Sequence, residues 1–138
     1  MARVRDIMTT NVVTISLDER LDLVDEIMTS ANIRHIPVTK GGSVVGIVSQ
    51  RDLLRARLSS LGGYSSREDQ QFLRDVDVAE VMTKDVRCAD PNESVVHAAK
   101  RMIEAKIGCL PVVDKDGELV GLITETDVMR HFAETASD

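Results

Sequence analysis

The chain alternates short β-branched segments with segments in which apolar residues recur at helical spacing. Residues 12–15 (Val-Val-Thr-Ile) predict a strand. Apolar residues then recur on one face of a predicted helix, namely Leu21, Val24, Met28 and Ala31. Residues 35–39 and 44–48 predict two strands joined by the turn 40–43, in which glycine supplies a positive φ. A last helix is expected from Ser49, so the order is strand, helix, hairpin, helix.

The same order returns in the second half of the chain. Met8 reappears as Met82, 74 positions later, and Asp52 reappears as Asp127, 75 positions later, after one residue has been added in a turn. The repeat covers nearly the whole chain except for about residues 56–77. Two copies are too few for a solenoid, so they predict a pseudo-symmetric pair packed face to face.

Both long helices are preceded by capping signals. Residues 16–19 (Ser-Leu-Asp-Glu) have the spacing of a capping box and predict a helix that opens there. Residues 90–93 are expected to do the same in the second copy, with Pro91 at the first helical position, where its missing N–H is harmless. The second helix is expected to bury one face, made of Val95, Ala98, Ala99 and Met102.

These patterns predict an α/β (α+β) fold made of two repeats and a linker. The first repeat spans residues 1–57, the linker 58–77 and the second repeat 78–138. Residues 59–66 are rich in Ser and Gly and predict a flexible joint. A short polar helix is expected from Arg67 to Asp75, since Ser66 can cap it.

Composition and charge narrow the classes of function. Aromatic residues make up 2% of the 138 residues, which disfavours a protein that stacks single-stranded bases. The net charge of −6 disfavours nucleic acid and anionic membrane surfaces as partners. No apolar run is long enough to span a membrane, and the N-terminus lacks a signal-peptide pattern, so a cytoplasmic location is expected. Cys88 and Cys109 are expected to be buried thiols in a reducing compartment.

The candidate chemistry lies at two helix starts. Ser49 precedes Asp52 by three residues, and Thr124 precedes Asp127 by three residues, each pair just after a predicted strand. One interpretation is a capping box, although such boxes normally use Glu or Gln, and Asp is expected to reach back poorly. The other is a ligand site, because a carboxylate beside a helix start accepts hydrogen bonds from a ribose diol and free N–H groups suit a phosphate.

Because these motifs occur at equivalent positions of both copies, the chain is similar to a known family. The residues that carry the likeness are Met8-Thr9, Ile36-Pro37-Val38 and Gly46-Ile47-Val48-Ser49-Gln50-Arg51-Asp52, with Met82-Thr83, Leu110-Pro111-Val112 and Gly121-Leu122-Ile123-Thr124-Glu125-Thr126-Asp127 in the second copy. The chain resembles a tandem pair of CBS domains, also called a Bateman module. The resemblance implies β-α-β-β-α repeats packed with pseudo-two-fold symmetry through their sheets. It also implies clefts between the repeats that often bind adenine nucleotides, and disc-like dimers.

The resemblance further implies roles for individual residues. The hydroxyl and the Asp of each pair would hold the nucleotide. Arg34 and His35 would reach phosphates, often across to the site anchored by Thr124 and Asp127, unless they are only a solvated Arg and a strand-edge His. Arg34 could also reach the Ser49/Asp52 site. Their counterparts, Gly108-Cys109, carry no charge. The Thr124/Asp127 site is therefore predicted to be the tighter one for AMP, ADP or ATP.

Apolar residues are expected to sandwich the adenine, because the chain has too few rings to stack on it. The candidates are Val12, Val13, Ile36 and Pro37 in the first copy and Val86, Ile107, Leu110 and Pro111 in the second. Their alternative interpretation is ordinary core.

The resulting hypothesis is a regulatory, energy-sensing module that binds an adenine nucleotide as a regulatory ligand and changes conformation or partner. It requires no cofactor, forms a homodimer and regulates an unidentified protein in trans. The alternative is a dimerising scaffold with no nucleotide function, or a module for another small ligand such as S-adenosylmethionine. An enzyme is not expected, because neither copy adds an acid, base or nucleophile to the repeated binding residues. No metal site is expected either, since His35, His97 and His131 have no partners at metal-ligand spacing.

Overall fold

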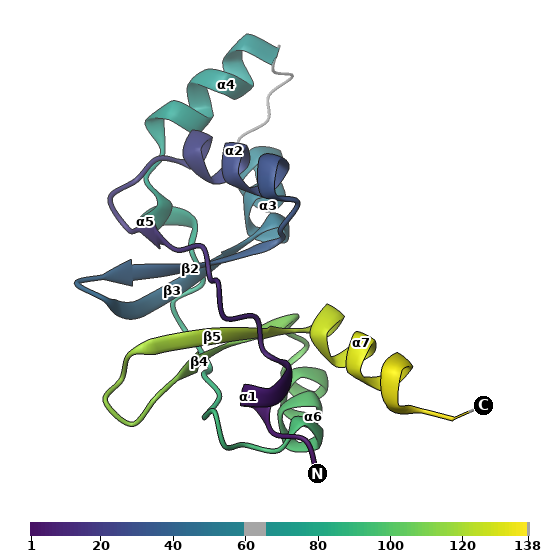
Figure 1. Ribbon diagram of the computed structural model, residues 1–138. Coiled ribbons are helices and arrows are strands. Elements are labelled where there is room, and N and C mark those ends of the chain that lie inside the picture. The colour runs from purple at the N-terminus through teal and green to yellow at the C-terminus, as the bar shows by residue number, and fades with distance from the viewer. Residues whose placement is uncertain (60–65, 138) are drawn as a thin grey trace. The chain divides into compact units, whose positions relative to one another are not determined.

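The computed structural model describes residues 1–59 and 66–137, and it is a mixed α/β structure (Figure 1). Of the joint predicted over 59–66, residues 60–65 lie outside the described residues, whereas Ser59 and Ser66 belong to helices. The chain divides into two compact units. The first-repeat unit is Val13–Asp85, and the second-repeat unit combines Met1–Val12 with Val86–Asp138. The segment that precedes the first repeat therefore belongs to the second-repeat unit, and the segment that precedes the second repeat belongs to the first-repeat unit.

A three-stranded sheet forms the base of the first-repeat unit. Its strands, in the order β1-β2-β3, are β1 (Ile15–Ser16), β2 (His35–Lys40) and β3 (Ser43–Ser49). β1 pairs in parallel with β2, and β2 pairs antiparallel with β3. The strand predicted over 12–15 was wrong in its bounds, since the ladder includes only Ile15 of that run. Gly41 and Gly42 form the two-residue loop between β2 and β3, and both have positive φ, as predicted.

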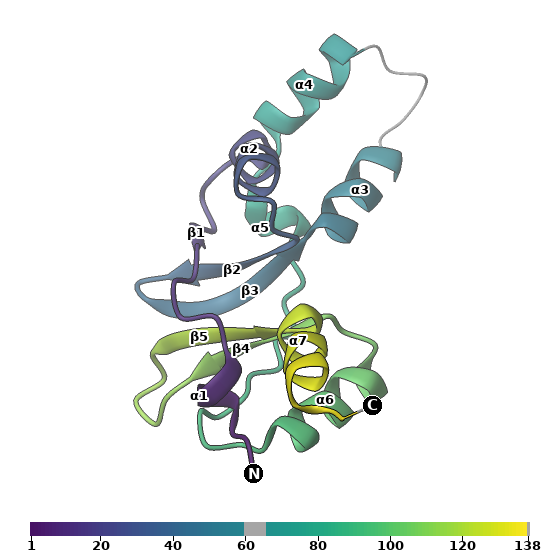
Figure 2. The same ribbon diagram turned by 45° about the vertical axis from the view of Figure 1, so that its right-hand side comes forward.

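Helices cover this sheet and close its core. They are α2 (Leu21–Ala31), α3 (Gln50–Ser59), α4 (Ser66–Asp75) and α5 (Val78–Val81). Both views place α2 and α3 on the same side of the β2–β3 hairpin (Figures 1 and 2). The predicted inner face of α2 is confirmed at Leu21, Val24 and Met28, which are buried, whereas Ala31 is exposed. These residues join Ile36, Val38 and Val48 of the sheet in one apolar core.

α4 is an integral part of the first-repeat unit. The helix lies where a short polar helix was predicted, but its inner face is apolar: Leu73 is fully buried and Phe72 packs against the core. Arg57 of α3 ties α4 to α2, because its guanidinium lies 3.2 Å from an Asp25 oxygen and 3.4 Å from an Asp69 oxygen. Residues 66–75 therefore belong to a folded core.

The second-repeat unit has a smaller sheet. Its elements are α1 (Val4–Ile7), α6 (Val95–Ala105), β4 (Cys109–Val113), β5 (Leu119–Thr124) and α7 (Glu125–Thr135). β4 and β5 form an antiparallel hairpin. The first strand of this repeat is reduced to a single parallel bridge between Ala89 and Val112. The unit's core contains Val4, Ala98, Met102, Leu110 and Ile123.

The predicted starts of α2 and α6 were wrong by several residues. α2 begins at Leu21 after residues 16–19 have formed a turn. α6 begins at Val95, and Ser94 caps it by accepting from the His97 amide at 3.0 Å. The physical reason lies in distant segments: the Leu21 amide donates to the Val76 carbonyl, and the Val95 amide donates to the Ala2 carbonyl. Such tertiary backbone bonds satisfy helix-start amides that a local capping box would otherwise serve.

Candidate functional site

Asp127 lies buried at the start of α7, with 5% of its surface exposed. Its Oδ2 accepts hydrogen bonds from the Thr124 amide at 2.9 Å and from the Thr124 hydroxyl at 3.1 Å. The Asp127 amide in turn donates to the Thr124 Oγ1 at 3.2 Å. The capping box is therefore complete, and the expectation that an Asp reaches back poorly was wrong. The extended backbone of Thr124 turns its N–H toward the carboxylate, so the shorter side chain suffices.

Asp52 repeats this arrangement at the start of α3. The Ser49 amide donates to the Asp52 Oδ2 at 2.9 Å, and the Asp52 amide donates to the Ser49 Oγ at 3.0 Å. The side chain of Asp52 is 11% exposed. In both repeats, one carboxylate oxygen thus caps the helix start through a short bond.

A threonine from the leading segment completes each site. The Thr9 hydroxyl lies 3.4 Å from both Asp127 oxygens, and the Thr83 hydroxyl lies 3.3 and 3.4 Å from the Asp52 oxygens. Paired backbone bonds fix these threonines, because Thr9 exchanges two with Leu122, and Thr83 exchanges two with Ile47. Thr9 and Thr83 were not among the site residues predicted from the sequence. Their recurrence in the two Met-Thr motifs was the signal that could have identified them.

Glycine allows the leading segments to approach so closely. A methyl group on Gly121 would lie 2.5 Å from the Met8 Sδ and 3.1 Å from the Thr9 carbonyl oxygen. A methyl group on Gly46 would lie 2.5 Å from the Met82 Sδ. A side chain at either glycine would require the neighbouring methionine side chain to move.

An arginine lies beside each carboxylate. The Arg130 Nη1 is 3.4 Å from the Asp127 Oδ1, and the Arg55 Nη1 is 3.7 Å from the Asp52 Oδ1. Both side chains are mostly exposed, so these pairs are weak and the guanidinium groups can reach other anions. The sequence analysis missed them too, although they recur in register three residues after each Asp.

Arg34 and His35 lie in the first-repeat unit, the unit of Asp52. Arg34 is exposed, and its carbonyl accepts from the amide of Gln50, the first residue of α3. His35 opens β2 and is in register with Ser49. The Thr124/Asp127 pair belongs to the other unit, so the predicted reach of Arg34 and His35 toward it stays a prediction.

The eight apolar residues predicted to contact adenine differ in how deeply they are buried. Four are buried in β2 and β4, and these are Ile36, Pro37, Leu110 and Pro111. Ile36 and Leu110 belong to the hydrophobic cores, which confirms the core interpretation for these two. Val12, Val86 and Ile107 are half-buried, whereas Val13 is exposed. Contact of any of the eight with adenine stays a prediction.

An open pocket of about 390 Å³ adjoins Asp52 within the first-repeat unit. α3, α4 and α5 line it together with the residue that follows α4. Its lining side chains are Asp52, Arg55, Ala56, Phe72, Val76, Glu80 and Val81. The lining therefore includes four apolar residues, one of them aromatic, and three charged residues.

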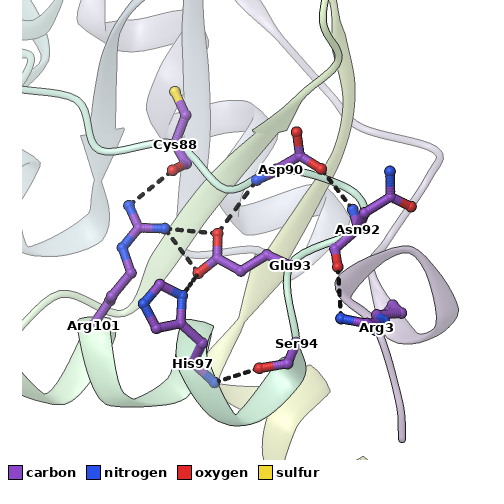
Figure 3. Close-up of polar contacts among 8 residues, drawn as sticks. All are labelled: Arg3, Cys88, Asp90, Asn92, Glu93, Ser94, His97 and Arg101. Carbon is purple, nitrogen blue, oxygen red and sulfur yellow. Dashed lines mark hydrogen bonds and ion pairs between the residues drawn. The ribbon is translucent and has the colours of Figure 1, made fainter.

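A second polar cluster surrounds Glu93 at the start of α6 (Figure 3). Arg101 donates to both Glu93 oxygens at 2.9 and 3.0 Å and to the Cys88 carbonyl at 2.8 Å, and the Glu93 Oε2 lies 2.8 Å from the His97 Nδ1. Burial raises the pKa of the Cys88 thiol, and the Arg101 charge offsets part of that rise. The cluster braces the turn before α6, and a thiol with a raised pKa is a poor nucleophile at neutral pH.

Among residues 1–59 and 66–137, no three His, Cys, Asp or Glu side chains converge as a metal site would require. Within the same ranges, no helix has the length and apolar character needed to cross a bilayer.

The family model described as "CBS domain" matches residues 4–59 and 78–134. The chain belongs to the CBS domain family. The two matches make it a CBS domain pair, in agreement with the resemblance drawn from the repeated motifs. The paired regulatory module is the class of protein that these matches support.

Several solved structures share the fold, and one of them is a CBS domain pair. The CBS domain pair of protein MJ0100, in complex with 5′-methylthioadenosine and S-adenosyl-L-methionine, has 28% identity and a TM-score of 0.83, with 99% of each chain covered. CBSX2 in complex with AMP has 26% identity and a TM-score of 0.80, covering 97% of this chain and 98% of that chain. Protein MJ1225 from Methanocaldococcus jannaschii has 30% identity and a TM-score of 0.81, covering 94% of this chain and 47% of that one.

Curated relatives place the same module in different proteins. A CBS domain-containing protein of Dictyostelium discoideum is 32% identical over 91% of this chain and 88% of its own length. A homoserine O-acetyltransferase of Methanococcoides burtonii is 34% identical over 92% of this chain but only 23% of its own length. The chain thus spans about a quarter of that enzyme and less than half of MJ1225. The match to the acetyltransferase is confined to a small part of the enzyme.

Proposed function

We propose that this CBS domain pair is a cytoplasmic regulatory module that binds adenine nucleotides of the AMP, ADP and ATP class. The observation that carries the proposal is the repeated carboxylate site. In each repeat, one oxygen of the Asp makes a short bond to the helix-start amide, while the other has only contacts of 3.3 Å or longer. An ionised carboxylate accepts about four hydrogen bonds, so the second oxygen has room for a ribose diol.

The neighbouring groups suit the rest of a nucleotide. Arg130 and Arg55 are exposed and adjacent to the carboxylates, and a guanidinium offers a planar fork of donors for phosphate. The solved CBS pairs with AMP, and with 5′-methylthioadenosine and S-adenosylmethionine, support an adenosyl ligand. S-adenosylmethionine is accordingly the alternative ligand for this module.

Ligand binding would act through the leading segments. The Thr9 hydroxyl contacts Asp127, and the Thr83 hydroxyl contacts Asp52, so a ligand on either carboxylate competes with its contact to a Met-Thr segment. A ligand with different affinities for the two arrangements shifts their populations. The shifted arrangement would in turn regulate a protein partner in trans, as an energy sensor does.

Two expectations refine the proposal. The Thr124/Asp127 site is the tighter one if Arg34 and His35 serve it, because Gly108 and Cys109 offer no charge in return. The module forms a homodimer. A dimerising scaffold with no nucleotide function is the competing hypothesis.

Isothermal titration with AMP, ATP and S-adenosylmethionine tests the proposal. Binding should weaken at least tenfold in Asp127→Asn, in which the amide oxygen can still cap α7. The matched control is Asp116→Asn, which removes the same charge from the exposed turn of the same unit. If no ligand gives heat or a thermal shift at millimolar concentration, the scaffold hypothesis replaces the proposal.

A further inference from the structure

The turn before α6 receives the leading segment of the second-repeat unit, residues 2–9. Three successive carbonyls of this turn, those of residues 91–93, accept hydrogen bonds from residues 3–5 at 2.8–3.1 Å. The Val95 amide returns a bond to the Ala2 carbonyl at 3.1 Å. The beginning of the leading segment is therefore docked on the turn at four successive residues.

Polar side chains fix the shape of this turn (Figure 3). The Glu93 side chain is 11% exposed, and its two oxygens accept from Arg101 at 2.9 and 3.0 Å. The same guanidinium donates to the Cys88 carbonyl at 2.8 Å, so Arg101 joins the two ends of the loop. His97 lies 2.8 Å from the second Glu93 oxygen. Loss of the Arg101 charge would leave a nearly buried carboxylate poorly compensated, and this loss would loosen the turn.

A short helix connects this turn to Thr9. Val4 is fully buried and begins α1, and the Met8 amide donates to the Val4 carbonyl at 2.9 Å. Thr9 follows directly, with two backbone bonds to Leu122 and with its hydroxyl 3.4 Å from both Asp127 oxygens. A displacement of the turn would therefore move α1, and Thr9 with it.

The first repeat holds its leading segment in another way. The positions 74 residues before the three cluster residues are Glu19, Leu23 and Ile27. Glu19 is exposed, and the other two pack against the core. An ion pair between Arg20 and Asp77, 2.6 Å apart, links α2 to the leading segment there. Both of its side chains are exposed, so the pair is weak. The buried charge cluster thus distinguishes the second repeat from the first.

We propose that Glu93 and Arg101 are positioning residues that hold Thr9 against Asp127 and thereby regulate ligand binding at that carboxylate. The Thr9 hydroxyl competes with a ribose diol for the carboxylate oxygens, so a firmly held Thr9 weakens the ligand and a loosened one strengthens it. A bound ligand in turn loosens the leading segment, because the coupling is reciprocal. This inference rests on the proposed function, since it names the regulation of one of the two carboxylate sites.

Hydrogen exchange measured by NMR on the full chain tests the positioning role without a ligand. Arg101→Met removes the charge and should speed exchange of the Val4 and Thr9 amides at least tenfold, while the Thr83 amide of the first repeat changes less than twofold. The matched control is Lys100→Met, which removes the same charge from the exposed neighbouring position of α6. Unchanged exchange at Thr9 would overturn the inference.

Two milder variants keep the test decisive if Arg101→Met does not fold. Glu93→Gln preserves the shape of the side chain and one acceptor oxygen, and it should speed exchange of the Thr9 amide at least threefold. Arg101→Lys keeps the charge, so its exchange rate should lie closer to that of the parent protein than the rate of Glu93→Gln does. If Glu93→Gln exchanges at the parent rate, the inference fails.

Calorimetric titration with AMP tests the regulatory role. An Asp52→Asn background allows the Asp127 site to be observed alone. Arg101→Met should bind AMP at least threefold more tightly, whereas damage to the fold alone would weaken binding. Lys100→Met should change the affinity less than twofold. Unchanged or weaker AMP binding in Arg101→Met, together with faster exchange at Thr9, would overturn the inference and leave the proposed function standing.

Failure of the proposed function gives a different result. If the parent protein binds neither AMP, ATP nor S-adenosylmethionine, the proposed function fails and the regulation fails with it. The exchange experiment uses no ligand, so it decides separately whether the Glu93 cluster positions Thr9.

Discussion

At the scale of single residues, the two aspartates combine a structural role with a candidate binding role. Each caps its helix through one oxygen and contacts a leading-segment threonine. The caps were predictable because a capping box involves residues three apart in sequence. Thr9 and Thr83 were not identified as site residues because they lie 118 and 31 positions from the aspartates that they contact.

The Thr9 hydroxyl should contribute measurably to stability. Asp127 is 5% exposed, so water compensates poorly when a donor is removed. Thr9→Val should lower the free energy of unfolding by about 1 kcal/mol, as measured by urea denaturation. The control is Thr126→Val, at an exposed position of α7, which should change stability by less than about 0.5 kcal/mol. Equal effects of the two changes would contradict a role for the Thr9 contact.

The close approach at Gly121 makes a second prediction for single residues. Gly121→Ala should destabilise the protein by about 1–3 kcal/mol, because the new methyl group overlaps the Met8 side chain. Adding Met8→Ala should recover part of this loss. The double variant should therefore be destabilised by less than the sum of the destabilisations of the two single variants. Thermal unfolding of all four proteins measures the coupling. Strict additivity would mean that Met8 does not pack on Gly121.

At the scale of elements, the position of α4 was predictable but its packing was not. Ser66 and the early acidic residues indicated a helix, and its many charged residues indicated a solvated one. Only the packing against α2 and α3 reveals that Leu73 and Phe72 face a core. Two apolar residues in a polar helix do not by themselves show that the helix packs on a core, because the surface that they cover is not visible in the sequence.

α4 should therefore contribute to global stability. Leu73→Ala should lower the free energy of unfolding by about 2–4 kcal/mol, since the side chain is fully buried. Arg74→Ala, at the exposed neighbouring position on the same helix, should change it by about 0.5 kcal/mol or less. Chemical denaturation measures the free energy of unfolding of both variants. A small effect of Leu73→Ala would mean that residues 66–75 act as a detached linker.

At the C-terminal end of α6, a substitution is expected to stabilise the protein by relieving backbone strain. Lys106 caps this helix at φ 55°, in the left-handed region that favours glycine. Lys106→Gly should stabilise the protein by about 0.5–1 kcal/mol. Lys100→Gly, in the exposed middle of the same helix, should destabilise it by about 1 kcal/mol. Both values come from thermal unfolding, and a loss of stability in Lys106→Gly would contradict the expected relief of strain.

At the scale of the whole molecule, the proposed homodimer has a specific candidate surface. The last helix of each repeat exposes large apolar side chains, namely Leu54 and Leu58 on α3 and Met129 and Phe132 on α7. Exposed apolar residues on equivalent helices of both repeats are typical of a surface that another chain covers. Their recurrence in both repeats makes them the surface that we propose for the homodimer.

Light scattering tests this proposal. The parent protein should have twice the chain mass of 15.2 kDa, and Phe132→Glu should shift it toward the monomer. The control is Ile103→Glu, a change at another exposed apolar residue, on α6, which should leave the dimer intact. A monomeric parent, or dissociation by both variants alike, would remove α3 and α7 as the proposed surface.

The sequence by itself determined the repeat, the order of the longer helices and the two hairpins, and the two capping pairs, because periodicity, turn glycines and three-residue caps are local properties. The tertiary structure decided which segments complete each unit. It joined Met1–Val12 to the second repeat and residues 78–85 to the first, placed Thr9 and Thr83 on the aspartates, and placed Phe72 in the lining of the Asp52 pocket. These outcomes depend on which surfaces, far apart in the chain, pack against each other. The spacing of residues along a single sequence does not show which surfaces these are.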